Sequence, residues 1–164
     1  MKRLFLFLTI ALVALVSCKK DDNSSSLEGR WNVYREANDD SDYTHSLIFK
    51  GNKLDIYIIA WGEHVEGTYT YANNEITYNI TKQWKAWSNV AYDDSGKMIS
   101  SSWLAGDMDK DTFKLLPGYD WYPLADGDPQ DVKEMLHKIS FKITSSTTAE
   151  TNLGPGPGIA HKAK

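Results

Sequence analysis

Beyond the first 26 residues, apolar and polar residues alternate along most of the chain, which predicts β-strands rather than helices. In the clearest runs the apolar residue recurs at every second position, as in Leu54, Ile56 and Ile58. A period of two places successive side chains on opposite faces of a strand. Gly51-Asn52 and Asn73-Asn74 separate such runs and are typical of tight turns. We therefore expect a meander of five consecutive strands between Trp31 and Ile80.

The pattern of the second half is less regular. The segment Lys82–Tyr92 fits either a longer strand or an excursion from the sheet. Asp128 and Pro129 are suited to the start of a helix, as N-cap and first helical residue. We expect strands at 97–104, 112–116 and 137–144, an aromatic loop at 118–123, and a short helix from Asp128 to about His137. The glycine- and proline-rich run at 154–158 interrupts any regular element, so residues 145–164 are predicted to be a flexible C-terminal tail.

About eight strands with one apolar face throughout favour an all-β fold, because closing an antiparallel meander into a barrel removes its sheet edges. The prediction is an antiparallel up-and-down barrel over residues 27–144, with one short helix before the last strand. Small barrels of this strand number either fill their interior with side chains or hold one small ligand.

The N-terminus has the organisation of an export signal over residues 1–17. Lys2 and Arg3 precede an apolar run, Leu4–Val16, that is shorter than the roughly 20 residues of a membrane-spanning helix. Leu15-Val16-Ser17-Cys18 resembles the lipobox of bacterial lipoproteins. The resemblance implies cleavage before Cys18 and attachment of lipid to its sulfur and amine, which anchors the chain stably in a membrane.

Cys18 is also the only cysteine of the chain, so the domain has no disulfide. Residues 18–26 then serve as the lipidated cysteine and a polar tether. The run Lys19-Lys20-Asp21-Asp22 resembles the surface-export signal of lipoproteins in some Gram-negative groups. We expect the protein at the outer membrane, lipid-anchored and facing the cell exterior.

Gly29 and Trp31 stand at the start of the first predicted strand and look like the Gly-x-Trp opening of the lipocalins. Together with the strand layout they resemble the lipocalin-like domains of exported bacterial lipoproteins. In that family the tryptophan closes the barrel floor and packs beneath a basic side chain of the last strand. The resemblance assigns that role to Lys142, where the classical family has arginine; the family's Thr-Asp-Tyr motif is absent.

Charge and motifs argue against several classes of function. The formal net charge of −4 does not suit a nucleic-acid partner. No Gly-x-Ser-x-Gly elbow is present, and Glu63 and Glu66 have opposite phase in one strand, so we expect no enzyme. The acidic run Asp107–Asp111 lacks the glycine and glutamate of a calcium loop, and the histidines lack metal-ligand spacing. No metal or cofactor is expected.

Aromatic residues are the remaining functional signal, with six tryptophans and nine tyrosines in the chain. The candidate ligand contacts are Trp61, Trp84, Trp87, Trp103, Trp121 and Tyr122. One hypothesis is a barrel that binds a small hydrophobic or amphipathic molecule between these rings. The alternative is a non-enzymatic module with a filled barrel, which binds a glycan or a protein through its loop aromatics. Core packing explains any single ring equally well.

Overall fold

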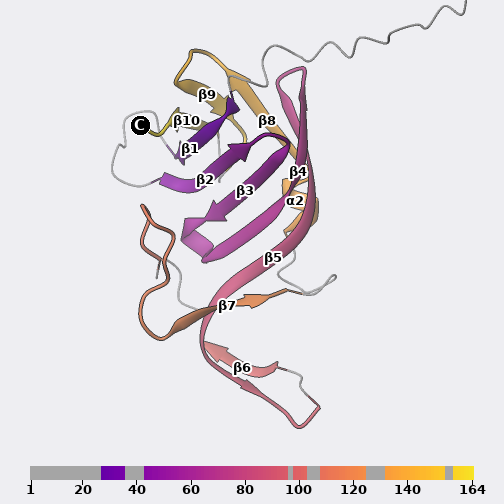
Figure 1. The fold of residues 1–164 in the computed structure, drawn as a ribbon, viewed down its shortest axis with the longest axis vertical. Helices are drawn as coiled ribbons and strands as arrows, with labels where there is room; N and C mark the ends of the chain where they lie inside the picture. The colour runs from indigo at the N-terminus through magenta and orange to yellow at the C-terminus, as the bar shows by residue number, and fades with distance from the viewer. Residues whose placement is uncertain (1–26, 36–42, 96–97, 103–107, 125–131, 154–156) are drawn as a thin grey trace, which may run out of the picture.

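The computed structural model describes residues 27–35, 43–95, 98–102, 108–124, 132–153 and 157–164. Within them the chain forms antiparallel strands, one 3-10 helix and one short α-helix (Figure 1). The strands are β1 (Gly29–Tyr34), β2 (Tyr43–Lys50), β3 (Lys53–Ile58), β4 (Glu63–Ala72), β5 (Glu75–Tyr92), β6 (Met98–Ser102), β7 (Tyr119–Pro123), β8 (Lys138–Ile143), β9 (Thr148–Thr151) and β10 (Gly158–Lys162). The 3-10 helix η1 spans Ile59–Trp61 and the α-helix α2 spans Lys133–Leu136.

Eight of these strands close into a barrel. They follow the order β4-β3-β2-β1-β10-β9-β8-β5, and the pairing of β4 with β5 joins the two ends. Neighbours in this order are antiparallel, and strands adjacent in sequence lie side by side except where β5 pairs next with β8. Closure provides backbone partners on both sides of each barrel strand. The predicted fold class, an antiparallel up-and-down barrel with one short helix, is confirmed.

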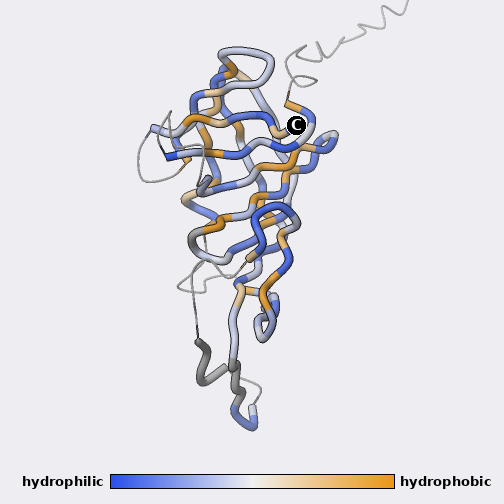
Figure 2. Tube along the Cα trace, turned by 90° about the vertical axis from the view of Figure 1, so that its left-hand side faces the viewer, coloured by the Kyte–Doolittle hydropathy of each residue, from blue (hydrophilic) through white to orange (hydrophobic). Residues whose placement is uncertain are grey.

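The first five strands form the predicted meander. The turn between β4 and β5 has Asn73 and Asn74 at φ 54° and 62°, a left-handed conformation that asparagine tolerates better than most residues. Gly51 has a similar φ of 62° in the turn between β2 and β3. Figure 2 shows hydrophobic and hydrophilic positions alternating along these strands. The period of two seen in the sequence therefore corresponds to an inner and an outer barrel face.

The barrel interior around Trp31 is filled by side chains. The rings of Trp31 and Phe141 meet edge to face at 5.4 Å, and those of Phe49 and Tyr69 lie 5.1 Å apart. Around them lie aliphatic side chains with no measurable exposure: Leu47, Leu54, Ile56, Val65, Ile76, Leu136 and Ile139. Burying each such side chain contributes roughly 1.5–3 kcal/mol to stability. This core supports the fold without a disulfide.

The expectation of a flexible tail at 145–164 is wrong, because this segment supplies two barrel strands. β9 pairs with β8, and β10 pairs with both β9 and β1. Ala149 of β9 and Ala160 of β10 are fully buried in the core. Small alanines and a glycine at the start of β10 give this segment a weak hydrophobic signal. It nevertheless completes the sheet through its backbone, and the domain extends beyond residue 144.

The basic residue next to Trp31 is Lys162 of β10, and the assignment of this role to Lys142 is wrong. The Nζ atom of Lys162 lies 5.4 Å from the centre of the Trp31 ring. Lys142 is exposed on β8 and forms an ion pair with Glu150, with Nζ and Oε2 3.1 Å apart. Gly29, at φ 106°, adopts a backbone conformation that favours glycine, and it lies beside the Lys162 stem. The assignment to Lys142 was wrong because β9 and β10 were not predicted as strands.

β5 continues beyond the barrel and carries the excursion of the second half (Figure 1). Its outer part pairs with β6 on one edge and β7 on the other. The predicted loop at 118–123 is therefore a strand. The predicted strand at 112–116 is wrong, because Phe113 has φ 56° and Asp109 Oδ1 accepts a bond of 2.7 Å from the Thr112 amide. Residues 109–112 therefore form a turn that is closed by hydrogen bonds to the Asp109 carboxylate.

Candidate functional site

Polar side chains gather on the inner face of the barrel at the end where η1 joins β3 to β4, which we call the η1 end. Strand register places one row of neighbours across this face: His45, Ile58, Glu63, Lys85 and Tyr122. Gln83 and Trp87 flank Lys85 at alternate positions of β5 and therefore share its face. Glu63, Gln83, Lys85 and Trp87 are all at most 5% exposed. The interior thus changes from apolar around Trp31 to polar at the η1 end.

Glu63 and Lys85 form a buried ion pair between β4 and β5. The Lys85 ammonium donates a hydrogen bond of 2.6 Å to Glu63 Oε1. Burial raises the pKa of the Glu63 carboxyl, and the bond to Lys85 acts against that shift. Removing two charges from water costs several kcal/mol per ion, so a pair of this kind adds little net stability. The pair therefore brings two opposite charges into the barrel interior at the η1 end.

Several polar atoms beside this pair have no hydrogen-bond partner among the residues that the structure describes. They are Glu63 Oε2, both side-chain polar atoms of Gln83, and Trp87 Nε1. Leaving a buried donor or acceptor unpaired costs about 1–3 kcal/mol, and folded proteins rarely tolerate it. Four such atoms on three neighbouring inward side chains offer two acceptors and two donors to a polar group placed between them.

His45 belongs to the same row, on β2. It is 6% exposed, and burial lowers the pKa of its imidazole to about 4. The Nδ1 atom lies 2.9 Å from Thr44 Oγ1. His45 is therefore neutral at physiological pH, and the charges of this row come from Glu63 and Lys85.

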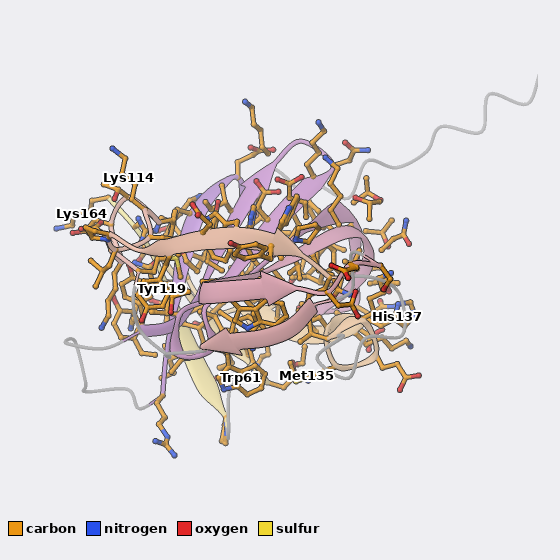
Figure 3. All side chains as sticks on the ribbon, turned by 90° about the horizontal axis from the view of Figure 1, so that it is seen from below. Trp61, Lys114, Tyr119, Met135, His137 and Lys164 are labelled. Carbon is orange, nitrogen blue, oxygen red and sulfur yellow. The ribbon has the colours of Figure 1, made fainter. Side chains whose placement is uncertain are left out.

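The predicted aromatic contacts fall on different surfaces. Trp87 and Tyr122 share the inner side of the β5–β7 pair, with ring centres 6.2 Å apart. Trp84 and Trp121 lie on the outer side, near His64. Trp61, on η1, is 41% exposed, and Figure 3 shows it at the periphery when the molecule is viewed from the β6 end. Trp103 and Cys18 lie outside the described residues.

The outer surface at this position carries a stack of rings. Tyr57 lies face to face with Phe113 at 4.0 Å and with His64 at 4.1 Å, and Trp84 continues the stack 4.9 Å beyond His64. The Arg30 guanidinium caps the far side of Phe113 at 4.5 Å and bonds to the carbonyls of Lys110 and Asp111. These contacts fasten the 108–118 turn to the outside of the barrel.

A β-bulge explains why the sequence did not identify the inner polar residues. Gly67 pairs with Ile80 but Glu66 pairs with Lys82, so β5 has one additional residue at this point. The extra residue reverses which side chains face inward. Continuing the alternation from Ile80 would place Lys82 and Trp84 inside, whereas the structure places Gln83, Lys85 and Trp87 there. Gly67 is the detectable signal, because a Cβ at this position would lie 2.1 Å from the Asn79 oxygen.

No protein-family model, curated protein or solved structure matches this chain significantly. No helix among the described residues is long and apolar enough to cross a membrane. The η1 end offers hydrogen-bond donors and acceptors, a buried ion pair and two aromatic rings in one place. Such a set can bind and orient a polar group.

Proposed function

We propose that this chain is a non-enzymatic, lipid-anchored barrel protein of the lipocalin type that binds one small amphipathic molecule at its η1 end. The observation that carries the proposal is the group of unpartnered buried atoms on Glu63, Gln83 and Trp87. A ligand that has both a hydrogen-bond donor and an acceptor would satisfy them at once. The neighbouring rings of Trp87 and Tyr122 provide apolar contact for the rest of such a molecule.

The filled core favours an amphipathic ligand over a purely hydrophobic one. Trp31, Phe49 and Phe141 fill the space that a long apolar molecule would need deep in the barrel. A hydrocarbon at the η1 end would leave the Gln83 amide and the Trp87 indole N–H unsatisfied. The ligand class therefore narrows to molecules with a polar head and a compact apolar part.

Variants of inward residues test this proposal. Gln83→Leu keeps the side-chain size and removes both amide partners, so we expect the full chain to lose its bound molecule. The matched control is Trp84→Phe, which alters a residue of the same strand on the outer face. Native mass spectrometry of each full chain, released from detergent, measures the occupancy. A copurified molecule that survives Gln83→Leu but not Trp84→Phe would contradict the proposed site.

A glycan- or protein-binding module is the second candidate, and the exposed ring of Trp61 is the observation in its favour. Trp84 and Trp121 contribute less to such a surface, because His64 already stacks against Trp84 and both rings are half-buried. Absence of any bound small molecule in the native mass spectrum, together with retention of the chain on immobilised glycans, would favour this candidate.

The lipid anchor rests on the sequence Leu15-Val16-Ser17-Cys18 and on Cys18 being the only cysteine. Diacylglycerol on this thiol, with a further acyl chain on the amine, would tether the domain through residues 18–26 to the outer membrane. Metabolic labelling with palmitate tests the anchor. We expect the wild-type chain to be labelled and Cys18→Ser to be unlabelled. A labelled Cys18→Ser chain would contradict lipidation at this residue.

A further inference from the structure

Three side chains with metal-ligating atoms meet on the outer face of the barrel, opposite the polar row. Asp55 of β3 pairs directly with Glu66 of β4, and Tyr57 pairs with His64, two residues before Glu66. Alternate residues share a face, so Asp55, His64 and Glu66 project together. One potential ligand atom from each of the three lies within 4.8 Å of the others.

The imidazole of His64 is held in place by stacking. Tyr57 lies parallel to one face at 4.1 Å and 3°, and Trp84 covers the other at 4.9 Å and 15°. Its Nε2 atom is buried and has no hydrogen-bond partner in the described part of the chain. Glu66 Oε1 is 3.9 Å away, which is too long for a hydrogen bond. The ring edge that carries Nε2 is thus oriented toward the carboxylates without bonding to them.

The two carboxylates repel one another across the strands. Like charges at directly opposed positions destabilise a sheet, and Asp55 and Glu66 are such a pair. Lys82 Nζ lies 3.7 Å from Glu66 Oε2, and its side chain is 65% exposed. Lys53 also acts on Asp55 through its charge. These two lysines are peripheral, whereas a cation between Asp55 and Glu66 would offset the repulsion directly.

We propose that Asp55, His64 and Glu66 bind one divalent first-row transition-metal ion, with Zn²⁺ as its representative, on the outer face of the barrel. Imidazole nitrogen and carboxylate oxygen are both ligands of Zn²⁺, at about 2.0–2.2 Å. An imidazole ligand disfavours Mg²⁺ and Ca²⁺, which prefer oxygen. Three protein ligands leave a coordination position for water or another donor. The sequence did not indicate this site, because its ligands come from two strands and form no local motif.

This site is independent of the proposed ligand site, since Glu63 and His64 are adjacent and project to opposite faces. The two proposals therefore fail separately. Isothermal titration of metal-stripped full-length protein with ZnCl₂ measures metal binding directly. We expect saturation at one equivalent of Zn²⁺ and no comparable heat with MgCl₂.

Two variants remove ligands by different means. His64→Phe keeps an aromatic ring between Tyr57 and Trp84 but has no nitrogen, and Asp55→Asn removes one carboxylate charge. We expect each to weaken Zn²⁺ binding by at least about 100-fold. Loss of a group that only hydrogen-bonds to a metal ligand already weakens metal binding by up to about 100-fold, and these variants remove a ligand itself. His161→Phe is the matched control, because its ring also contacts an aromatic side chain, Tyr34.

The control should bind Zn²⁺ as the wild type does. Thermal unfolding of each metal-free variant shows whether the fold is retained, and Asp55→Asn provides the test if His64→Phe does not fold. The proposal is overturned if the wild type shows no saturable Zn²⁺ binding. It is also overturned if a folded His64→Phe or Asp55→Asn chain binds Zn²⁺ as tightly as the wild type.

Discussion

The ammonium of Lys162 lies 5.4 Å from the centre of the Trp31 ring, across the seam where the last strand of the barrel pairs with the first. Trp31 has no exposed surface, and its indole N–H donates a bond of 2.8 Å to the Leu27 carbonyl. The lysine stem covers the ring while its charge stays near the surface. The two ends of the domain thus meet at this strand pair, and the Lys162–Trp31 contact lies directly on it.

Lys162→Ala should destabilise the protein by about 1–2 kcal/mol, because it removes both the stem and the cation from the Trp31 ring. Lys142→Ala is the matched control and should cost less than about 0.5 kcal/mol, since an exposed ion pair contributes little. Urea denaturation of the two variants measures the difference. Equal losses of stability would show that the Lys162 contact has no special role in closing the barrel.

Truncation after Thr144 should prevent folding. It removes β9 and β10, and with them the pairing that joins β8 to β1. Two strands would then expose unpaired backbone groups and the core would lose Ala149, Leu153 and Ala160. Thermal unfolding followed by circular dichroism should show no cooperative transition. A truncated chain with wild-type melting behaviour would mean that the last strands are dispensable.

Lys85→Met should destabilise the protein by about 3–5 kcal/mol, because it leaves the buried Glu63 charge without its partner. The double variant Glu63→Met with Lys85→Met should recover most of this loss, since neither charge then remains in the interior. Denaturant titration of the two variants provides the comparison. If the double variant is no more stable than Lys85→Met, burial of an unpaired charge is not the cause.

Stability should fall as the pH is lowered from about 6.5 to about 4, partly through His45. Burial lowers the pKa of this imidazole from 6.5 to about 4, so between these values the unfolded chain binds a proton that the folded chain does not. The full contribution, about 3 kcal/mol, is present above pH 6.5 and is lost toward pH 4. The pKa of His64 is lowered in the same way, also to about 4, and adds to the effect.

Urea denaturation between pH 4 and 7 measures this dependence. His45→Gln should flatten it, because the substituted side chain does not titrate. A change at His137, whose side chain is exposed, serves as the control. A His45→Gln chain with the wild-type pH dependence would exclude His45 as a source.

The sequence predicted the barrel because its first five strands show a clean period of two and well-defined turn residues. The two C-terminal strands were not predicted, because β9 and β10 bury alanine, threonine and glycine rather than large apolar residues. Their place in the fold comes from backbone pairing with β8 and β1, which has no local signature. The wrong assignment of the Trp31 contact to Lys142 follows from this, because the residue that makes the contact, Lys162, lies in β10.

The site was predicted only in part, because strand phase decides which side chains converge. The sequence singled out Trp87 and Tyr122, which lie on the inner face with the polar row, but grouped them with Trp84 and Trp121 of the outer face. The bulge opposite Gly67 separates the two sets, and this glycine alone does not show where β5 has its additional residue. Buried Glu63 and Lys85 gave no signal because each looks like an ordinary surface charge until the register is known.

Electron density at the η1 end of the barrel shows directly whether an amphipathic molecule occupies it. The full chain should be purified from its own membrane without exchange of bound molecules and crystallised. We predict continuous non-protein density within hydrogen-bond distance of the Gln83 amide and Trp87 Nε1, extending toward Tyr122. Separate water peaks bridging Glu63, Gln83 and Trp87, with no connected density between them, would mean that no such molecule binds at the η1 end.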